Sequence, residues 1–216
     1  AQKRPTNVQE IAPLVDYVLD FHTGGAGREN FSNVRCVFRD GPTLELANLF
    51  GSPFIVNSKT IPKSIRETLK KMGKTILLFE GGKSLDLDRQ VTQSGITGAL
   101  NVLDYLGVKK FPSDYVPYIE TSKQIIFKDS KWIRANFSGM YRSIVRNGTQ
   151  IKKGGIIGLI TDPYGFFERK VTASASGYII CLNHSPIVNS GDAIAHIAIV
   201  NEEVEKLNLK DKTGKI

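Results

Sequence analysis

A histidine and a glutamate occupy equivalent places in two separate stretches of this chain. His22 follows the largely apolar run Tyr17–Phe21, and Glu80 follows the apolar run Ile76–Phe79, and glycines come soon after each of them. Neutral imidazole is the commonest protein ligand for zinc. A partly desolvated carboxylate can move protons during hydrolysis. The two residue types in this repeated setting therefore point to metal-assisted hydrolysis.

Each residue taken alone has a simpler explanation. His22 would be a histidine at the end of a strand that is hydrogen-bonded to backbone, and Glu80 a solvated glutamate that begins a loop. Asp20 stands two residues before His22, on the same face of an extended strand, where its carboxylate could orient the imidazole ring. Two strands of the same kind, each delivering a residue capable of catalysis, form a more specific pattern than either one alone.

Alternating helix and strand signals in the first part of the chain predict the elements that position these residues. The run Tyr17–Phe21 is predicted to be a short buried strand that holds His22 at the mouth of a sheet. The other predicted elements are helices over Thr43–Phe50, Ile65–Met72 and Gly95–Leu106, and strands over Phe54–Val56 and Thr75–Phe79. Helices that alternate with short apolar strands are typical of an α/β sheet with helices on its faces.

The pattern changes after about residue 129, where short strands are separated by closely spaced turn signals. The segment Val145–Gly154 is echoed by Pro186–Ile194, which indicates two halves that interleave about a pseudo-twofold axis. We therefore expect an α/β domain over residues 1–128, a small all-β barrel-sandwich domain over 129–204 and a polar tail over 205–216.

Composition and charge narrow the classes of function. The net charge is +8, but the basic residues are scattered pairs rather than a stripe interleaved with aromatic residues, so a nucleic-acid binder ranks last. No apolar run is long enough to span a bilayer, and no signal-peptide pattern opens the chain. Cys36 and Cys181 are far apart in apolar settings and are expected to be buried free thiols. We expect a cytoplasmic protein without a membrane or nucleic-acid partner, and a homo-oligomer is possible.

Several motifs, taken in order along the chain, resemble the succinylglutamate desuccinylase/aspartoacylase family. They are Val18–Gly25, Ser64–Glu67, Phe79–Gly82, the helix Gly95–Gly107 and a β segment with Ser138-Gly139, Gly148, Lys153-Gly154, Ala175–Gly177 and Gly191-Asp192. This family is a branch of the zinc carboxypeptidase-like fold. The resemblance implies part of an α/β/α sheet followed by a barrel-sandwich domain. The hairpin Ala173–Gly177 contains no lysine, which excludes the role of a biotinyl or lipoyl carrier.

The resemblance also implies a reaction and a role for each candidate residue. The chain would be a zinc-dependent amidohydrolase or deacylase that cleaves an amide (or ester) bond in a small N-acyl amino acid. His22 would be the third zinc ligand, with Asp20 behind it, and Glu80 would activate the metal-bound water and protonate the leaving amine. Arg66 would bind the substrate or the charge of the transition state. The simpler reading of Arg66 is a surface helix residue.

The chain departs from the family pattern in one respect. Family members carry two further zinc ligands in a His-x-x-Glu motif and a substrate-binding Asn-Arg pair, both upstream of the Asp-x-His strand, and this sequence contains neither. We therefore expect it to be the C-terminal part of a longer protein, because a sheet that began here would expose apolar edges. The alternatives are a metal-free binding or scaffold protein on the same fold and a zinc carboxypeptidase that acts on peptides. Arg28, Asn30, Asn33 and Arg35 follow the glycine-rich turn, and the sequence gives them no specific role.

Overall fold

The computed structural model describes residues 8, 10–110 and 124–200. Its helical elements are a 3₁₀ turn η1 (Ala12–Leu14) and the helices α2 (Gly41–Phe50), α3 (Ile65–Lys71) and α4 (Arg89–Tyr105). Its strands are β1 (Tyr17–Gly24), β2 (Arg28–Cys36), β3 (Phe54–Asn57), β4 (Thr75–Lys83), β5 (Ile125–Phe127), β6 (Asp129–Arg134), β7 (Gly139–Ser143), β8 (Gln150–Ile151), β9 (Ile156–Thr161), β10 (Glu168–Thr172), β11 (Gly177–Asn183), β12 (Ile187–Val188) and β13 (Ala193–Ile199). No helix among these residues is long and apolar enough to cross a membrane.

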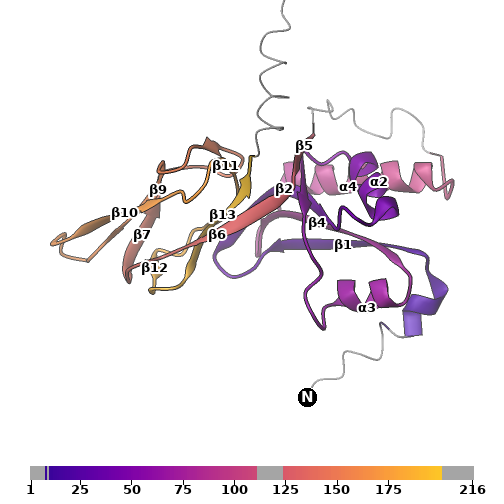
Figure 1. Cartoon of the computed structure of the whole chain (residues 1–216), viewed down its shortest axis with the longest axis horizontal. Coiled ribbons are helices and arrows are strands. Elements are labelled where there is room, and N and C mark those ends of the chain that lie inside the picture. The colour runs from indigo at the N-terminus through magenta and orange to yellow at the C-terminus, as the bar shows by residue number, and fades with distance from the viewer. Residues whose placement is uncertain (1–7, 9, 111–123, 201–216) are drawn as a thin grey trace, which may run out of the picture.

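The strands form a mixed sheet of nine strands and an antiparallel sheet of four (Figure 1). In the larger sheet, β1 runs parallel to β4, and β4 runs antiparallel to β2. On its other side β2 pairs with β11, so the sheet continues from the α/β part into the C-terminal β part. The predicted fold, an α/β sheet with helices on its faces followed by a small all-β barrel-sandwich domain, is confirmed, as a mixed α/β sheet followed by a small antiparallel β sheet.

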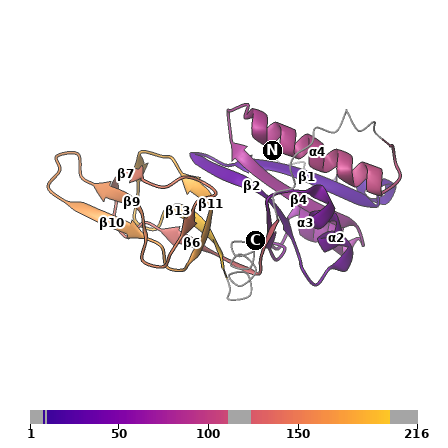
Figure 2. The same ribbon diagram turned by 90° about the horizontal axis from the view of Figure 1, so that it is seen from above.

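Helices cover both faces of the sheet in the α/β part, as Figures 1 and 2 show. Side chains on one face, among them Val34, Leu77 and Phe79, pack with Leu46 and Phe50 of α2 and with α4. On the other face, Leu69 of α3 packs against Ile76 and Val18. The alternation of apolar side chains along β1 and β4 is what lets each strand bury residues against helices on both sides.

The predicted interleaving of the two β halves is confirmed by strand pairing. The short strand β8 of the first half pairs with β11 of the second, and the equivalent strand β12 of the second half pairs with β7 of the first. Glycines with left-handed backbone follow at equivalent turns, with φ of 83° at Gly154 and 93° at Gly191. Between the two sheets lies a core that includes Ile157, Ile179, Ile194 and Ile197.

Two local predictions were wrong. The strand that carries His22 is not buried: β1 pairs only with β4 among the described residues, and Tyr17 and Phe21 are 47% and 49% exposed. Neither His22 nor Glu80 ends its strand, because β1 continues to Gly24 and β4 continues through its two glycines to Lys83. A side chain at Gly81 would lie 2.7 Å from Val91 of α4, so a glycine there permits the close helix packing. The predicted tail over 205–216 lies outside the described residues.

Candidate active site

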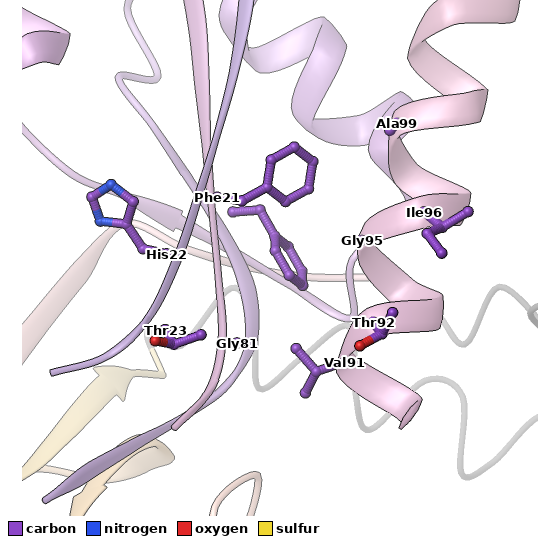
Figure 3. A pocket seen from close by; sticks show the side chains of 10 residues that line it. Phe21, His22, Thr23, Gly81, Val91, Thr92, Gly95, Ile96 and Ala99 are labelled. Atoms are coloured by element: carbon purple, nitrogen blue, oxygen red, sulfur yellow. The ribbon is translucent and has the colours of Figure 1, made fainter. Parts of the chain in front are cut away.

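His22 and Glu80 are direct neighbours on the sheet. Parallel pairing of β1 and β4 places His22 opposite Glu80 in the register, so the two side chains project from the same face. The His22 side chain is 49% exposed and the Glu80 side chain is 12% exposed. Figure 3 shows the imidazole on the opposite side of its strand from Phe21. The two strands therefore bring the predicted pair together on one polar face.

Asp20 contacts the His22 ring on that face. Its Oδ1 lies 3.1 Å from His22 Nε2, which is hydrogen-bonding distance. When Nε2 carries the ring proton and donates it to this carboxylate, Nδ1 presents its lone pair. No described residue bonds to Nδ1. The geometry is that of an imidazole oriented by a carboxylate, as in ligand histidines of metal sites.

Two residues of β2 contact the Glu80 carboxylate, and no specific role was predicted for either of them. The Asn30 amide Nδ2 donates a hydrogen bond of 2.6 Å to Oε2, and Arg35 Nε lies 3.9 Å from Oε1. Asn30 is only 8% exposed, so its amide is fixed by the surrounding protein. β2 has a bulge between Asn30 and Asn33, so that Asn30 pairs with Gly82 and Asn33 pairs with Glu80 of the neighbouring strand β4. No local pattern in the sequence reports this antiparallel pairing.

Arg66 reaches the same face from the first turn of α3. Ser64 caps this helix by accepting a hydrogen bond from the Glu67 N–H, and Arg66 Nη2 donates a bond of 2.6 Å to the Ser58 carbonyl. Burial, and then the nearby Arg35 guanidinium, lower the pKa of Arg66, while Asp20 and Glu80 act in the opposite direction. Arg66 is therefore a partly buried member of this polar cluster rather than a solvated surface residue.

The described residues do not form a complete zinc site. Among them, no group of three or more His, Cys, Asp or Glu side chains could hold a metal ion. A catalytic zinc normally takes three protein ligands and keeps one open position. His22 with Asp20 fits one such ligand and its orienting carboxylate, and the cluster does not fit a complete site.

The two cysteines are buried and free as predicted, and burial raises the pKa of Cys36 to about 12 and that of Cys181 to about 11.

The other two histidines lie in the β part and serve different contacts. His184 Nε2 lies 2.8 Å from Glu29 Oε2. His196 is 5% exposed, stacks on the Trp132 ring at 4.3 Å and lies 2.9 Å from Ser130 Oγ through Nε2. Burial, with a smaller contribution from Arg35, lowers the pKa of His196 from 6.5 to about 3. The imidazole of His196 is therefore neutral in the folded protein at ordinary pH.

His196 makes stability dependent on pH. Below its unfolded-state pKa of 6.5, the unfolded chain takes up a proton that the folded chain excludes until about pH 3. As the pH decreases from 6.5 to about 3, the contribution of His196 is expected to lower the free energy of unfolding by about 1.4 kcal/mol for each pH unit. Denaturant titrations of His196→Gln should lack this component, whereas His184→Gln should retain it. Equal pH dependence in the wild type and His196→Gln would contradict the assignment.

An apolar pocket of about 350 Å³ lies on the other side of β1, between the sheet and α4. Phe21, Phe79, Val91 and Ile96 line it, and His22 stands at its rim with the ring directed away (Figure 3). The pocket and the polar cluster therefore belong to opposite faces of the sheet. Hydrolytic chemistry requires the polar face, because the ionisable side chains gather there.

Comparisons with known proteins identify a family model and solved structures that share the fold. Residues 3–106 match the family model described as the succinylglutamate desuccinylase/aspartoacylase catalytic domain. The chain is similar to the product-bound structure of the ectoine utilization protein EutE (DoeB) from Ruegeria pomeroyi, with a TM-score of 0.78 and 17% identity over 89% of this chain and 60% of that one. It is also similar to a succinylglutamate desuccinylase/aspartoacylase from Rhodobacter sphaeroides, with a TM-score of 0.76 and 19% identity over 88% of this chain and 60% of that one.

The similarity to these solved structures covers most of this chain but only part of each of theirs. The chain spans about 60% of the length of both solved structures. No curated protein matches it significantly. At this identity the structural likeness establishes the shared fold, and the roles of individual residues depend on the geometry described above.

Proposed function

The chain belongs to the succinylglutamate desuccinylase/aspartoacylase family, and from this premise we propose that it forms part of a zinc-dependent deacylase. The reaction is hydrolysis of an amide (or ester) bond in a small N-acyl amino acid or a related compound. The observation that carries the proposal is the register of β1 and β4, which puts His22 beside Glu80, with Asp20 on the His22 ring. The proposed metal ligand and the proposed proton-transferring carboxylate are therefore neighbours on adjacent strands of one sheet.

Glu80 is the residue proposed to move protons. Its Oε2 is occupied by the Asn30 amide, so Oε1 is the oxygen proposed to take a proton from the attacking water and return it to the leaving amine. The 12% exposure of the side chain limits competition from bulk solvent. When bound, zinc would polarise the scissile carbonyl and acidify the water. His22 is proposed to hold the metal through Nδ1, and Asp20 to fix the imidazole tautomer.

Arg66 is proposed to bind a carboxylate of the substrate. A guanidinium pairs with carboxylate through two parallel N–H donors, and among the described residues Arg66 uses Nη2 alone, which donates to the Ser58 carbonyl. The small-molecule substrate is therefore proposed to carry at least one carboxylate, as an acylated amino acid does. The competing function is a metal-free binding or scaffold protein on the same fold.

An assay of the naturally expressed protein separates these two functions. Purified protein would be incubated with a panel of N-acetyl and N-succinyl amino acids, and release of the free amine would be measured. Loss of hydrolysis after chelation and its return with zinc are expected for the deacylase. Absence of hydrolysis across the panel with zinc supplied, together with tight binding of the acylated amino acids, would support the scaffold instead.

A further inference from the structure

We propose that Arg35 of β2 completes, together with Arg66, a two-guanidinium site for a carboxylate group, and that Arg35 determines the preference of the site for that group. The inference deepens the proposed function where the ligand is the substrate. Binding of a free carboxylate is nevertheless measurable without turnover, so the two proposals can fail separately.

Strand pairing places the backbone that carries Arg35 beside the segment that anchors Arg66. Arg35 lies in β2 opposite Val56 of β3, one residue before Cys36. The chain leaves β3 through Ser58, whose N–H donates to the Cys36 carbonyl at 2.8 Å. The Ser58 carbonyl in turn accepts the hydrogen bond from Arg66 Nη2. Arg66 is thus tied to the backbone that runs beside Arg35. The lowering of the pKa of Arg66 by Arg35 agrees with this proximity.

Most N–H donors of the Arg35 and Arg66 guanidinium groups have no protein partner among the described residues. A guanidinium carries five N–H donors. Arg35 uses Nε, at 3.3 Å from Asn33 Oδ1, and Arg66 uses Nη2. The side chain of Arg35 is only 17% exposed, so bulk water has limited access to its remaining donors. Donors of this kind near one another favour binding of an anion.

The nearby carboxylates are already engaged by other side chains. Asp20 contacts the His22 ring, and Glu80 accepts the short hydrogen bond from Asn30. Glu80 Oε1 lies 3.9 Å from Arg35 Nε, which is an ion-pair contact beyond hydrogen-bond length. The negative charges of Asp20 and Glu80 stabilise the charged state of the two arginines, but they accept no hydrogen bond from the remaining N–H donors. A planar carboxylate, which accepts two parallel N–H donors, matches the geometry of the unbonded N–H groups of these two guanidinium groups.

The test is a titration of the protein with acetate followed by NMR of the arginine side chains. Ionic strength is held constant by replacing chloride with acetate, and the Nε–Hε signals of Arg35 and Arg66 are monitored. Saturable shifts of both signals are expected. In Arg35→Gln the Arg66 signal should saturate at an acetate concentration at least about tenfold higher, which corresponds to about 1.4 kcal/mol.

Two further variants make the result specific. Arg35→Lys keeps the charge and loses the fork, so it too should bind acetate more weakly than the wild type. Arg39→Gln removes an exposed arginine just beyond β2 and should bind like the wild type. Dispersed backbone spectra of all variants confirm folding. Linear shifts in the wild type, or wild-type saturation in Arg35→Gln and Arg35→Lys, would overturn the proposal.

Discussion

Replacement of Glu80 by glutamine is expected to lower the rate of amide hydrolysis by about 10²–10⁴-fold. Glutamine preserves the size of the side chain, and its carbonyl can still accept the Asn30 hydrogen bond, but it cannot take up a proton. The metal content should stay unchanged, because Glu80 is not proposed as a ligand. Steady-state hydrolysis of the best N-acyl amino acid and zinc analysis of the same samples measure both effects.

The control is Glu168→Gln, which removes an exposed carboxylate from β10 in the other sheet. This variant should hydrolyse at the wild-type rate. Turnover of Glu80→Gln within a factor of about two of the wild type would remove Glu80 from the proton-transfer role. A parallel loss of zinc would instead assign Glu80 to the metal.

Gly98→Ala is expected to destabilise the α/β part by about 1–3 kcal/mol through overpacking. A Cβ at this position of α4 would lie 2.2 Å from the ring of Phe50, which is 2% exposed and has no room to retreat. The better helix propensity of alanine returns only about 1 kcal/mol. Chemical denaturation followed by far-UV circular dichroism measures the net change.

Gly95→Ala is the matched control on the same helix. Its Cβ would meet Phe21 at 3.4 Å, and Phe21 is half-exposed and can move. We expect this variant to be as stable as the wild type or more stable, because the helix propensity then dominates. Equal stability changes in the two variants would show that the packing of α4 on α2 is looser than described.

The local elements and their glycine boundaries were predictable because they depend on neighbouring residues. Gly51 ends α2 with a left-handed φ of 82°, and Ser64 caps α3, as the sequence indicated. The helix predicted from Gly95 begins at Arg89 instead, because Asp88 caps it by accepting from the N–H groups of Gln90 and Val91. The repeat in the β part could also be found, since each half carries its own turn signals.

Long-range pairing was not predictable, and it decides the site. His22 and Glu80 were recognisable because each follows an apolar run. The contacts of Asn30 and Arg35 with Glu80 depend on the antiparallel pairing of β2 with β4 and on the bulge in β2, which no local pattern predicts. The exposure of Phe21 likewise depends on which strands flank β1. The boundary at residues 128 and 129 stays a prediction, and the larger sheet runs across it through the pairing of β2 with β11.

The zinc content of the naturally expressed protein and of its His22→Ala variant tests whether His22 is a metal ligand. Both are purified without chelators or a histidine tag and analysed by elemental mass spectrometry. We expect about one zinc per chain in the wild type and none in the variant. Equal zinc in the two proteins, or none in the wild type, would contradict the assignment of His22 as a zinc ligand beside Glu80.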